Sequence, residues 1–200
     1  MNPVDQASNY NKIADHWSGA EFNRENGIGQ HKRALQFSKP SGKAIDVGCG
    51  SSGRIIDLLL VHGFEVEGLD SSIEMLKHAK TRHPDLVFSH ADICEWNFVE
   101  KYDFISAWDS IWHVPLKSQE LVLRKLCEIL ADDDVFIFTS GAVDEAGDGS
   151  NPCLGQELYH AALGIPALLK ILSDCGCICR HLENDDWPNL HLYIIAKKNG

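Results

Sequence analysis

The sequence predicts an α/β fold in which helices cover both faces of a seven-stranded, mostly parallel sheet, giving three layers. Short apolar runs alternate with amphipathic helical stretches between residues 43 and 141, which is typical of βαβ units. A glycine-rich turn, residues 48–53, directly follows the first apolar run. The last two apolar runs, 177–184 and 190–198, are joined by a short polar link. Strands with so short a link pair antiparallel, so the sheet ends in a hairpin.

The elements can be placed along the chain from these patterns. Residues 4–37 read as helical, with a break at the glycines of residues 26–29. A helix over 71–84 begins at Ser71 or Ser72, whose hydroxyls can cap it, and ends before Pro84. The expected strands are 43–47, 64–70, 86–92, 102–108, 134–141, 177–184 and 190–198, and the remaining helices are 53–63, 117–130 and 164–176. We expect one domain, made of an N-terminal helical cap (1–40), a ligand-binding core (41–143), a lid or substrate loop (144–164) and a C-terminal helix with its hairpin (165–200).

The segment 144–164 is polar and glycine-rich, and it lies at the end of the sheet where ligands bind in such folds. A long loop in a compact domain is either functional or mobile. We therefore expect a lid that is mobile without ligand and that brings Tyr159 or His160 to the site. A solvent-exposed connector is the alternative.

Composition limits the classes of partner. The chain has 200 residues, 24% of them charged, with a formal net charge of -11 and no basic tract, which argues against a nucleic-acid partner. No apolar run is long enough for a membrane span, and the N-terminus has no secretory pattern. The seven cysteines are then expected to be reduced thiols of a cytoplasmic protein, and the period-two set Cys175, Cys177 and Cys179 indicates one face of a strand. Histidines and acids show no metal-ligand spacing, so no metal is expected.

The glycine turn raises a question of charge. Gly48, Gly50 and Gly53 spell G-x-G-x-x-G and Asp70 follows, which is the pattern of a dinucleotide-binding turn. Asp46, however, stands just before the first glycine, where a carboxylate would repel a pyrophosphate. A ligand that carries a sulfonium and an ammonium group would be attracted instead, and S-adenosylmethionine is such a ligand. Asp70 suits ribose hydroxyls in either case.

At these residues the chain resembles the class I S-adenosylmethionine-dependent methyltransferases, from about residue 9 to residue 198. The resemblance implies a Rossmann-like fold and S-adenosylmethionine as cofactor, with S-adenosylhomocysteine as product. It also implies cofactor contacts. These would be Asp46, Gly48 and Gly50 for the methionine part, Asp70 and Ser71 for the ribose, and Asp92 and Ile93 for the adenine. Trp108 would lie near the sulfonium, and Trp17 belongs to the N-terminal helix that would close over the cofactor. One departure is Ser52, which occupies the place of the family's third glycine, so that the loop is one residue longer.

Methyl transfer requires an aligned acceptor and, for nitrogen or oxygen acceptors, a general base. His113 and His160 are the catalytic candidates, with His16 and His191 also considered; packing roles are the alternative for each. Asp109 can anchor a substrate amine or the cofactor's ammonium group, or can simply cap a helix. Trp112, Tyr159 and His191 complete the expected substrate-binding set.

The sequence thus predicts a methyltransferase that acts on a small molecule, because no appended domain is present and residues 108–111 lack the N-P-P-[YF] segment of members that modify nucleobases or glutamine. An NAD-dependent oxidoreductase and a non-catalytic cofactor-binding protein remain the alternatives. The acceptor and the oligomeric state stay open.

Overall fold

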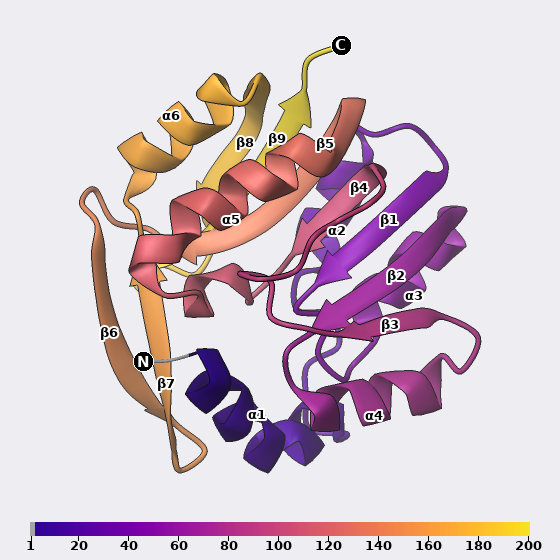
Figure 1. Ribbon diagram of the computed structural model, residues 1–200, viewed down its shortest axis with the longest axis vertical. Helices are drawn as coiled ribbons and strands as arrows, with labels where there is room; N and C mark the ends of the chain where they lie inside the picture. The colour runs from indigo at the N-terminus through magenta and orange to yellow at the C-terminus, as the bar shows by residue number, and fades with distance from the viewer. Residues whose placement is uncertain (1–2) are drawn as a thin grey trace.

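The middle layer is a seven-stranded sheet, as expected from the alternation of apolar and helical runs (Figure 1). The computed structural model describes residues 3–200. The strand order is β3-β2-β1-β4-β5-β9-β8. The strands are β1 (Gly42–Val47), β2 (Phe64–Asp70), β3 (Val87–His90), β4 (Tyr102–Ala107), β5 (Leu130–Gly141), β8 (Cys177–Asn184) and β9 (His191–Lys198). β1 to β5 pair in parallel, whereas β9 pairs antiparallel with both β5 and β8. The predicted C-terminal hairpin is confirmed.

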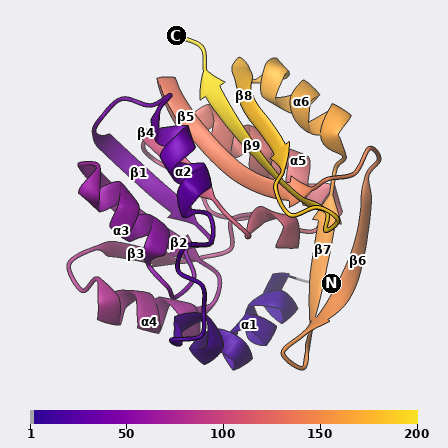
Figure 2. The ribbon, with the colours of Figure 1, turned by 180° about the vertical axis from the view of Figure 1, so that it is seen from behind.

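Helices cover both faces of this sheet, as Figures 1 and 2 show from opposite sides. One face packs against α5 (Leu116–Ile129) and α6 (Ile165–Asp174), and the other packs against α2 (Ile28–Leu35), α3 (Arg54–Val61) and α4 (Ile73–Arg82). The α4 helix begins after Ser72, whose hydroxyl accepts a hydrogen bond from the Met75 amide. Burial of β9 on both faces explains its continuous apolar sequence from Leu192 to Ala196.

Two further elements lie at the carboxyl ends of the strands. The helix α1 (Pro3–Ser18) lies beside a separate two-stranded sheet made of β6 (Gly147–Cys153) and β7 (Gln156–Ala162), as both ribbon views show. Asn9 Nδ2 donates to the Glu157 carbonyl at 2.8 Å, and Lys12 Nζ donates to Gln156 Oε1 at 3.1 Å. The short 3-10 turn η1 (Ile111–His113) packs against β7.

The segment 144–164 was expected to be a loop without regular structure, and that expectation is wrong. It forms the β6–β7 hairpin, in which β6 is almost wholly exposed while Leu158, Tyr159, Ala161 and Ala162 of β7 are buried. Neither strand shows the alternation expected of a half-buried strand, because β6 is polar and exposed and the buried residues of β7 come in adjacent pairs, so the pattern did not predict this hairpin.

The cysteines occupy ordinary packing positions. All seven are free thiols, and Cys177 and Cys179 lie on β8 while Cys175 ends α6. Within residues 3–200, no helix is both long enough and apolar enough to cross a membrane.

Candidate functional site

A cavity of about 340 Å³ opens at the carboxyl ends of β1, β2 and β4, where ligands bind in open α/β sheets. Its lining comes from the glycine turn, the ends of three strands, the segment after β4, one face of α1 and the β6–β7 hairpin. Of the residues proposed from sequence, the lining includes Trp17, Gly48, Gly50, Asp70, Ser71, Asp92, Ile93, Trp108, Asp109, Trp112, His113 and His160. Asp46, Tyr159 and His191 are not part of it.

The glycine turn after β1 is shaped by two different demands. Gly48 has a φ of 72°, and a Cβ there would lie 2.2 Å from the Ser110 Cβ, so the position must be glycine for packing. Gly50 has a φ of 59°, yet nothing lies within 4 Å of a Cβ built on it. An unfilled position of this kind lets a ligand approach the backbone closely.

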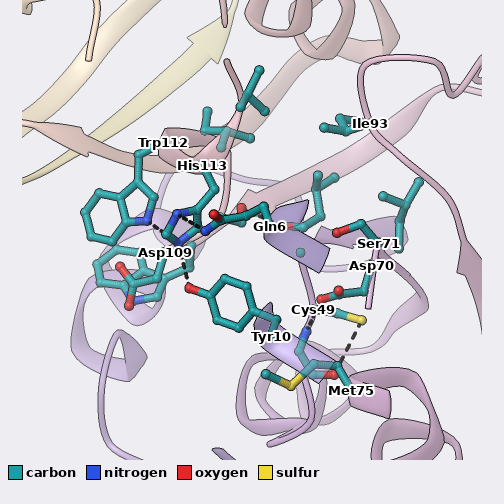
Figure 3. A pocket seen from close by; sticks show the side chains of 18 of the residues that line it. Gln6, Tyr10, Cys49, Asp70, Ser71, Met75, Ile93, Asp109, Trp112 and His113 are labelled. Carbon is teal, nitrogen blue, oxygen red and sulfur yellow. Dashed lines mark hydrogen bonds between the residues drawn. The ribbon is translucent and has the colours of Figure 1, made fainter. Parts of the chain in front are cut away.

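Asp70 fixes this turn from the end of β2. One carboxylate oxygen accepts from the Gly50 amide at 2.8 Å, and the other accepts from the Ser72 amide at 2.8 Å. Burial raises the pKa of the carboxyl, while these hydrogen bonds act to lower it. Figure 3 shows Asp70 and Ser71 side by side at the cavity wall. The remaining lone pairs of Asp70 suit a pair of ribose hydroxyls.

The third acid lies in the turn after β3. Asp92 Oδ1 accepts from the Cys94 amide at 2.9 Å, and the neighbouring Ile93 is buried. Lys125 on α5 holds this turn from below, because its Nζ donates to the carbonyls of residues 93, 94 and 96 at 2.8–3.1 Å. A carboxylate beside an apolar side chain in a fixed turn suits an adenine ring.

Asp46 does not face the cavity, contrary to the expectation from sequence. Its carboxyl is buried within the sheet layer, where burial raises its pKa to about 6, against a hydrogen bond with Ser106 and the charge of Arg54. The adjacent Val47 lines the cavity instead, since neighbouring strand residues point to opposite faces. The carboxylates that do face the cavity, and that would repel a pyrophosphate there, are Asp70, Asp92 and Asp109.

Several buried polar atoms around the cavity lack a partner within the protein. Among residues 3–200, four buried side-chain N or O atoms are unpartnered, namely Trp17 Nε1, Ser51 Oγ, His160 Nδ1 and His83 Nδ1. The first three belong to residues that line the cavity. Leaving a buried polar group unpaired is costly, so these atoms are suited to bind polar groups of a ligand or water in the cavity.

Arg54 is the cationic residue of the cavity wall. Its Nε donates to the Asn26 carbonyl at 2.7 Å and its Nη1 donates to Ser52 Oγ at 2.8 Å, while its guanidinium lies over the Phe22 ring. Burial lowers its pKa, whereas the charges of Asp109 and Asp46 raise it. Arg54, Ser51 and Trp17 are therefore suited to a carboxylate such as that of the methionine part of S-adenosylmethionine.

On the opposite side of the cavity, His113 is the centre of a hydrogen-bond network (Figure 3). Its Nδ1 lies 2.6 Å from the Tyr159 carbonyl, which can only accept, and its Nε2 lies 2.9 Å from Trp112 Nε1, which can only donate. Both contacts assign the proton to Nδ1 and the lone pair to Nε2, so the Gln6 amide nitrogen, 3.0 Å from Nδ1, lies beside that N–H and does not donate to it. Tyr10 Oη lies 2.7 Å from Nε2 and therefore donates to it.

This network makes His113 a poor base. Burial lowers its pKa to about 3, and a proton on Nε2 would face the Trp112 N–H. His160 lies next to it, with ring centroids 4.8 Å apart. Burial lowers the pKa of His160 as well, but its Nδ1 has no partner. Of the two histidines proposed from sequence, His160 thus keeps a nitrogen able to take a proton, and His113 positions Tyr10.

His191 and Asp109 form an ion pair at the edge of the cavity. His191 Nε2 lies 2.9 Å from Asp109 Oδ1, and its Nδ1 lies 2.5 Å from Asp185 Oδ1. Burial alone would lower the pKa of His191, but the hydrogen bonds and charges of the two carboxylates raise it to about 9. His191 is therefore charged at neutral pH and holds Asp109 from outside the cavity lining, and its direct contact with substrate stays a prediction.

Tyr159 also has a supporting position. Its hydroxyl accepts from the Leu116 amide at 3.0 Å, its carbonyl accepts from His113, and its amide donates to Gln6 Oε1 at 3.1 Å. The side chain is buried and ties the hairpin to α1 and to the start of α5. Delivery of its hydroxyl to the cavity, as expected from sequence, would break these contacts.

Sequence reasoning missed several lining residues. Gln6 and Tyr10 lie on the same face of α1 as the predicted Trp17, at the spacings of four and seven that a helix brings together. This periodicity is the signal that could have found them. Arg54 follows the glycine turn directly. Cys153 and Leu158 come from the hairpin, and no sequence pattern indicated that they line the cavity. His16, in contrast, is exposed and outside the lining. Within residues 3–200, no group of three or more His, Cys, Asp or Glu side chains can hold a metal ion.

Comparison with known proteins agrees with this geometry. A family model described as a methyltransferase domain matches residues 21–160. The crystal structure of an S-adenosylmethionine-dependent methyltransferase from Clostridium acetobutylicum has a TM-score of 0.72 at 16% identity and covers 96% of this chain and 99% of that one. The Burkholderia thailandensis 1,6-didemethyltoxoflavin-N1-methyltransferase, with bound S-adenosylhomocysteine, has a TM-score of 0.73 at 18% identity and covers 99% and 87%. The fold is thus that of S-adenosylmethionine-dependent methyltransferases.

Curated relatives match over shorter stretches. A trans-aconitate 2-methyltransferase of Rhizobium meliloti is 42% identical over 59 residues, which are 28% of this chain and 23% of that protein. A carboxy-S-adenosyl-L-methionine synthase of Sulfurimonas denitrificans is 32% identical over 118 residues, 56% of this chain and 48% of that protein. The chain thus spans less than half the length of these relatives. Because the family model covers well over half of the chain, the chain belongs to the methyltransferase domain family, as its sequence predicts.

Proposed function

We propose that this protein is an S-adenosylmethionine-dependent methyltransferase whose acceptor is a small molecule. The observation that carries the proposal is the single cavity wall that brings together Gly50, Asp70 and Asp92 at the ends of consecutive strands. The family match supports the same class. The cavity is enclosed in part by α1 and the hairpin, which suits a small acceptor better than a macromolecule.

The residues of the cavity lining fit the cofactor part by part. Asp70 with Ser71 would hold the ribose, Asp92 and Ile93 the adenine, and the unpartnered Ser51 and Trp17 with Arg54 the methionine carboxylate. Trp108 is fixed by its indole N–H, which donates to Asn26 Oδ1 at 2.8 Å. When bound, S-adenosylmethionine supplies an activated methyl group, which leaves its bonding electrons on sulfur as the acceptor's lone pair forms the new bond.

The chain's own task is then to orient the acceptor and to take its proton. Tyr10, which lines the cavity, donates its hydroxyl proton to His113, so its oxygen can only accept a hydrogen bond from a ligand. His160 has a nitrogen without a partner and a pKa lowered by burial, so it is unprotonated at neutral pH and can act as general base. Alignment of the acceptor by such fixed groups supplies about 7–11 kcal/mol in well-oriented reactions.

A thermal-shift comparison of S-adenosylmethionine, S-adenosylhomocysteine and NAD tests the class of ligand. A ligand at 100 times its dissociation constant stabilises a protein by about 2.7 kcal/mol, and we expect that effect from the first two compounds only. Stabilisation by NAD alone would mean an oxidoreductase. Binding of S-adenosylhomocysteine without turnover on any acceptor class would mean a non-catalytic binding protein.

A further inference from the structure

The side of the cavity formed by α1, the segment after β4 and the β6–β7 hairpin is where the methyl acceptor would bind, and we call it the acceptor side. Its protein atoms can accept hydrogen bonds from a substrate. The direction of the bonds follows from His113, because Nδ1 must donate to the Tyr159 carbonyl and Nε2 must accept from the Trp112 indole. The Tyr10 hydroxyl therefore donates to Nε2, at 2.7 Å, and has no proton left for a substrate. Tyr10 can only accept a hydrogen bond from a molecule in the cavity.

Asp109 adds a fixed negative charge on the same side. Its backbone adopts a φ of 51°, and its amide donates to Thr139 Oγ1 at 2.8 Å, so the position of the carboxylate is set by the fold. One carboxylate oxygen faces His191, which is shared with Asp185. Two carboxylates around one imidazolium leave a net negative charge beside the cavity.

In the described part of the chain, acids outnumber cations in the cavity lining, because Asp70, Asp92 and Asp109 face it and Arg54, whose charge also acts on Asp109, is the cation there. Arg54 is the only lysine or arginine of the cavity lining, and its bonds to Asn26 and Ser52 hold it at the glycine turn. The covering segment 144–164 contains Asp144, Glu145, Asp148 and Glu157 but no lysine or arginine. A cleft of one sign of charge attracts ligands of the opposite sign.

We propose that the acceptor is a small amine that enters as a cation, with its N–H groups bonded by the Asp109 carboxylate and the Tyr10 oxygen. This assignment rests on the proposed function and names the substrate class of that same site. Trp112 lines the same cavity and packs against His191, with ring centroids 5.4 Å apart, and an aromatic ring in a cavity favours a cation. A carboxylate acceptor would meet a charge of its own sign and a phenol oxygen with no proton to give.

The reaction balances with the groups present. The ammonium gives one proton to the neutral imidazole of His160, and the freed nitrogen lone pair forms the N–C bond. The electrons of the broken S–C bond stay on sulfur. The products are a methylated ammonium ion, S-adenosylhomocysteine and a protonated His160, which carry the same total charge as the reactants.

The test uses three probes of similar size, 2-phenylethylamine, 2-phenylethanol and 3-phenylpropionate, together with trans-aconitate. Each is titrated calorimetrically into the protein saturated with S-adenosylhomocysteine, and each is assayed for turnover of S-adenosylmethionine. We expect the amine to bind at least tenfold more tightly than the other three. We expect this preference to disappear in Asp109→Asn and to weaken in Tyr10→Phe, while Glu145→Gln, which removes an exposed charge from the hairpin segment, keeps it.

Three results would overturn the assignment. They are tighter binding of a carboxylate, equal or absent binding of all four probes, and an amine preference that survives Asp109→Asn. Loss of S-adenosylhomocysteine affinity in Asp109→Asn with the preference intact would assign Asp109 to the cofactor instead. These results leave the methyltransferase proposal standing, whereas failure of the wild-type protein to bind S-adenosylhomocysteine would remove both.

Discussion

The two sides of the cavity are built in different ways. Most of the cofactor side comes from the ends of β1, β2 and β3 and from the glycine turn, within residues 42–94, and the bonds of Asp70 and Asp92 there join residues 2 to 20 positions apart. The acceptor side joins α1, the segment after β4 and the hairpin, and its bonds span 46 to 153 residues. A rigid sheet edge thus provides the shared chemistry, and elements attached to it provide specificity.

The largest expected effect is on the acceptor side. We expect His160→Gln to lower kcat about 100-fold or more, the usual range for loss of a general base, with unchanged affinity for S-adenosylhomocysteine. Because burial lowers the pKa of His160, wild-type activity should rise with pH through a value below 6.5, and this acid limb should vanish in the variant. His16→Gln, on the exposed face of α1, is the control. An unchanged kcat would remove His160 from the reaction.

The next effect is on the cofactor side. Asp70→Asn removes a charge from a buried carboxylate that also holds two backbone amides, so we expect a loss of about 2–3 kcal/mol, or roughly 30- to 150-fold in Kd for S-adenosylhomocysteine. Asp92→Asn should cost only about 1 kcal/mol, because Ile93 keeps the apolar wall. Asp85→Asn, which is exposed, should change nothing. Calorimetry measures all three, and equal or reversed losses would show that the roles of the two acids are misassigned.

A smaller effect concerns stability and pH at the acceptor side. The pKa of His191 is raised to about 9 in the folded protein, above its unfolded value of about 6.5. Its stabilising contribution is therefore complete below about pH 6.5 and is lost as the pH rises through about 9. It amounts to about 3 kcal/mol, or roughly 6–12 °C in Tm.

Melting curves from pH 6 to pH 10 check this expectation against His191→Gln. The Tm of the wild type should fall across this interval, whereas the Tm of the variant should be lower at pH 6 and change less. His16→Gln should follow the wild type. Parallel curves for wild type and His191→Gln would mean that the two carboxylates do not hold a charged imidazole.

The same division explains what the sequence could predict. The strands, the helices and the turn acids follow from local patterns, so the sheet, its C-terminal hairpin and the cavity positions of Asp70 and Asp92 could be predicted. Asp46 was misplaced because strand alternation, rather than its place before the glycine, decides which way it points. The roles of His113 and Tyr159 depend on contacts with α1 across more than 100 residues, and no local pattern contains that information.

The hairpin provides the smallest effect and the finest test of the difference between the two sides. Its β6 strand is exposed and pairs only with β7, whereas β7 is buried and tied to α1 and η1. Exposed backbone hydrogen bonds open at low free energy, so we expect amides of residues 147–153 to exchange rapidly in the free protein and amides of 156–162 to exchange slowly. If the hairpin closes over the acceptor, addition of S-adenosylhomocysteine with an amine should slow amide exchange in β6. The C-terminal strands β8 and β9 serve as the internal reference.

Tyr159→Phe should speed exchange in β7, because it removes the acceptor of the Leu116 amide, while it leaves kcat within about twofold. Exchange in β6 that ligands do not change would make the hairpin a fixed wall of the cavity and not a lid.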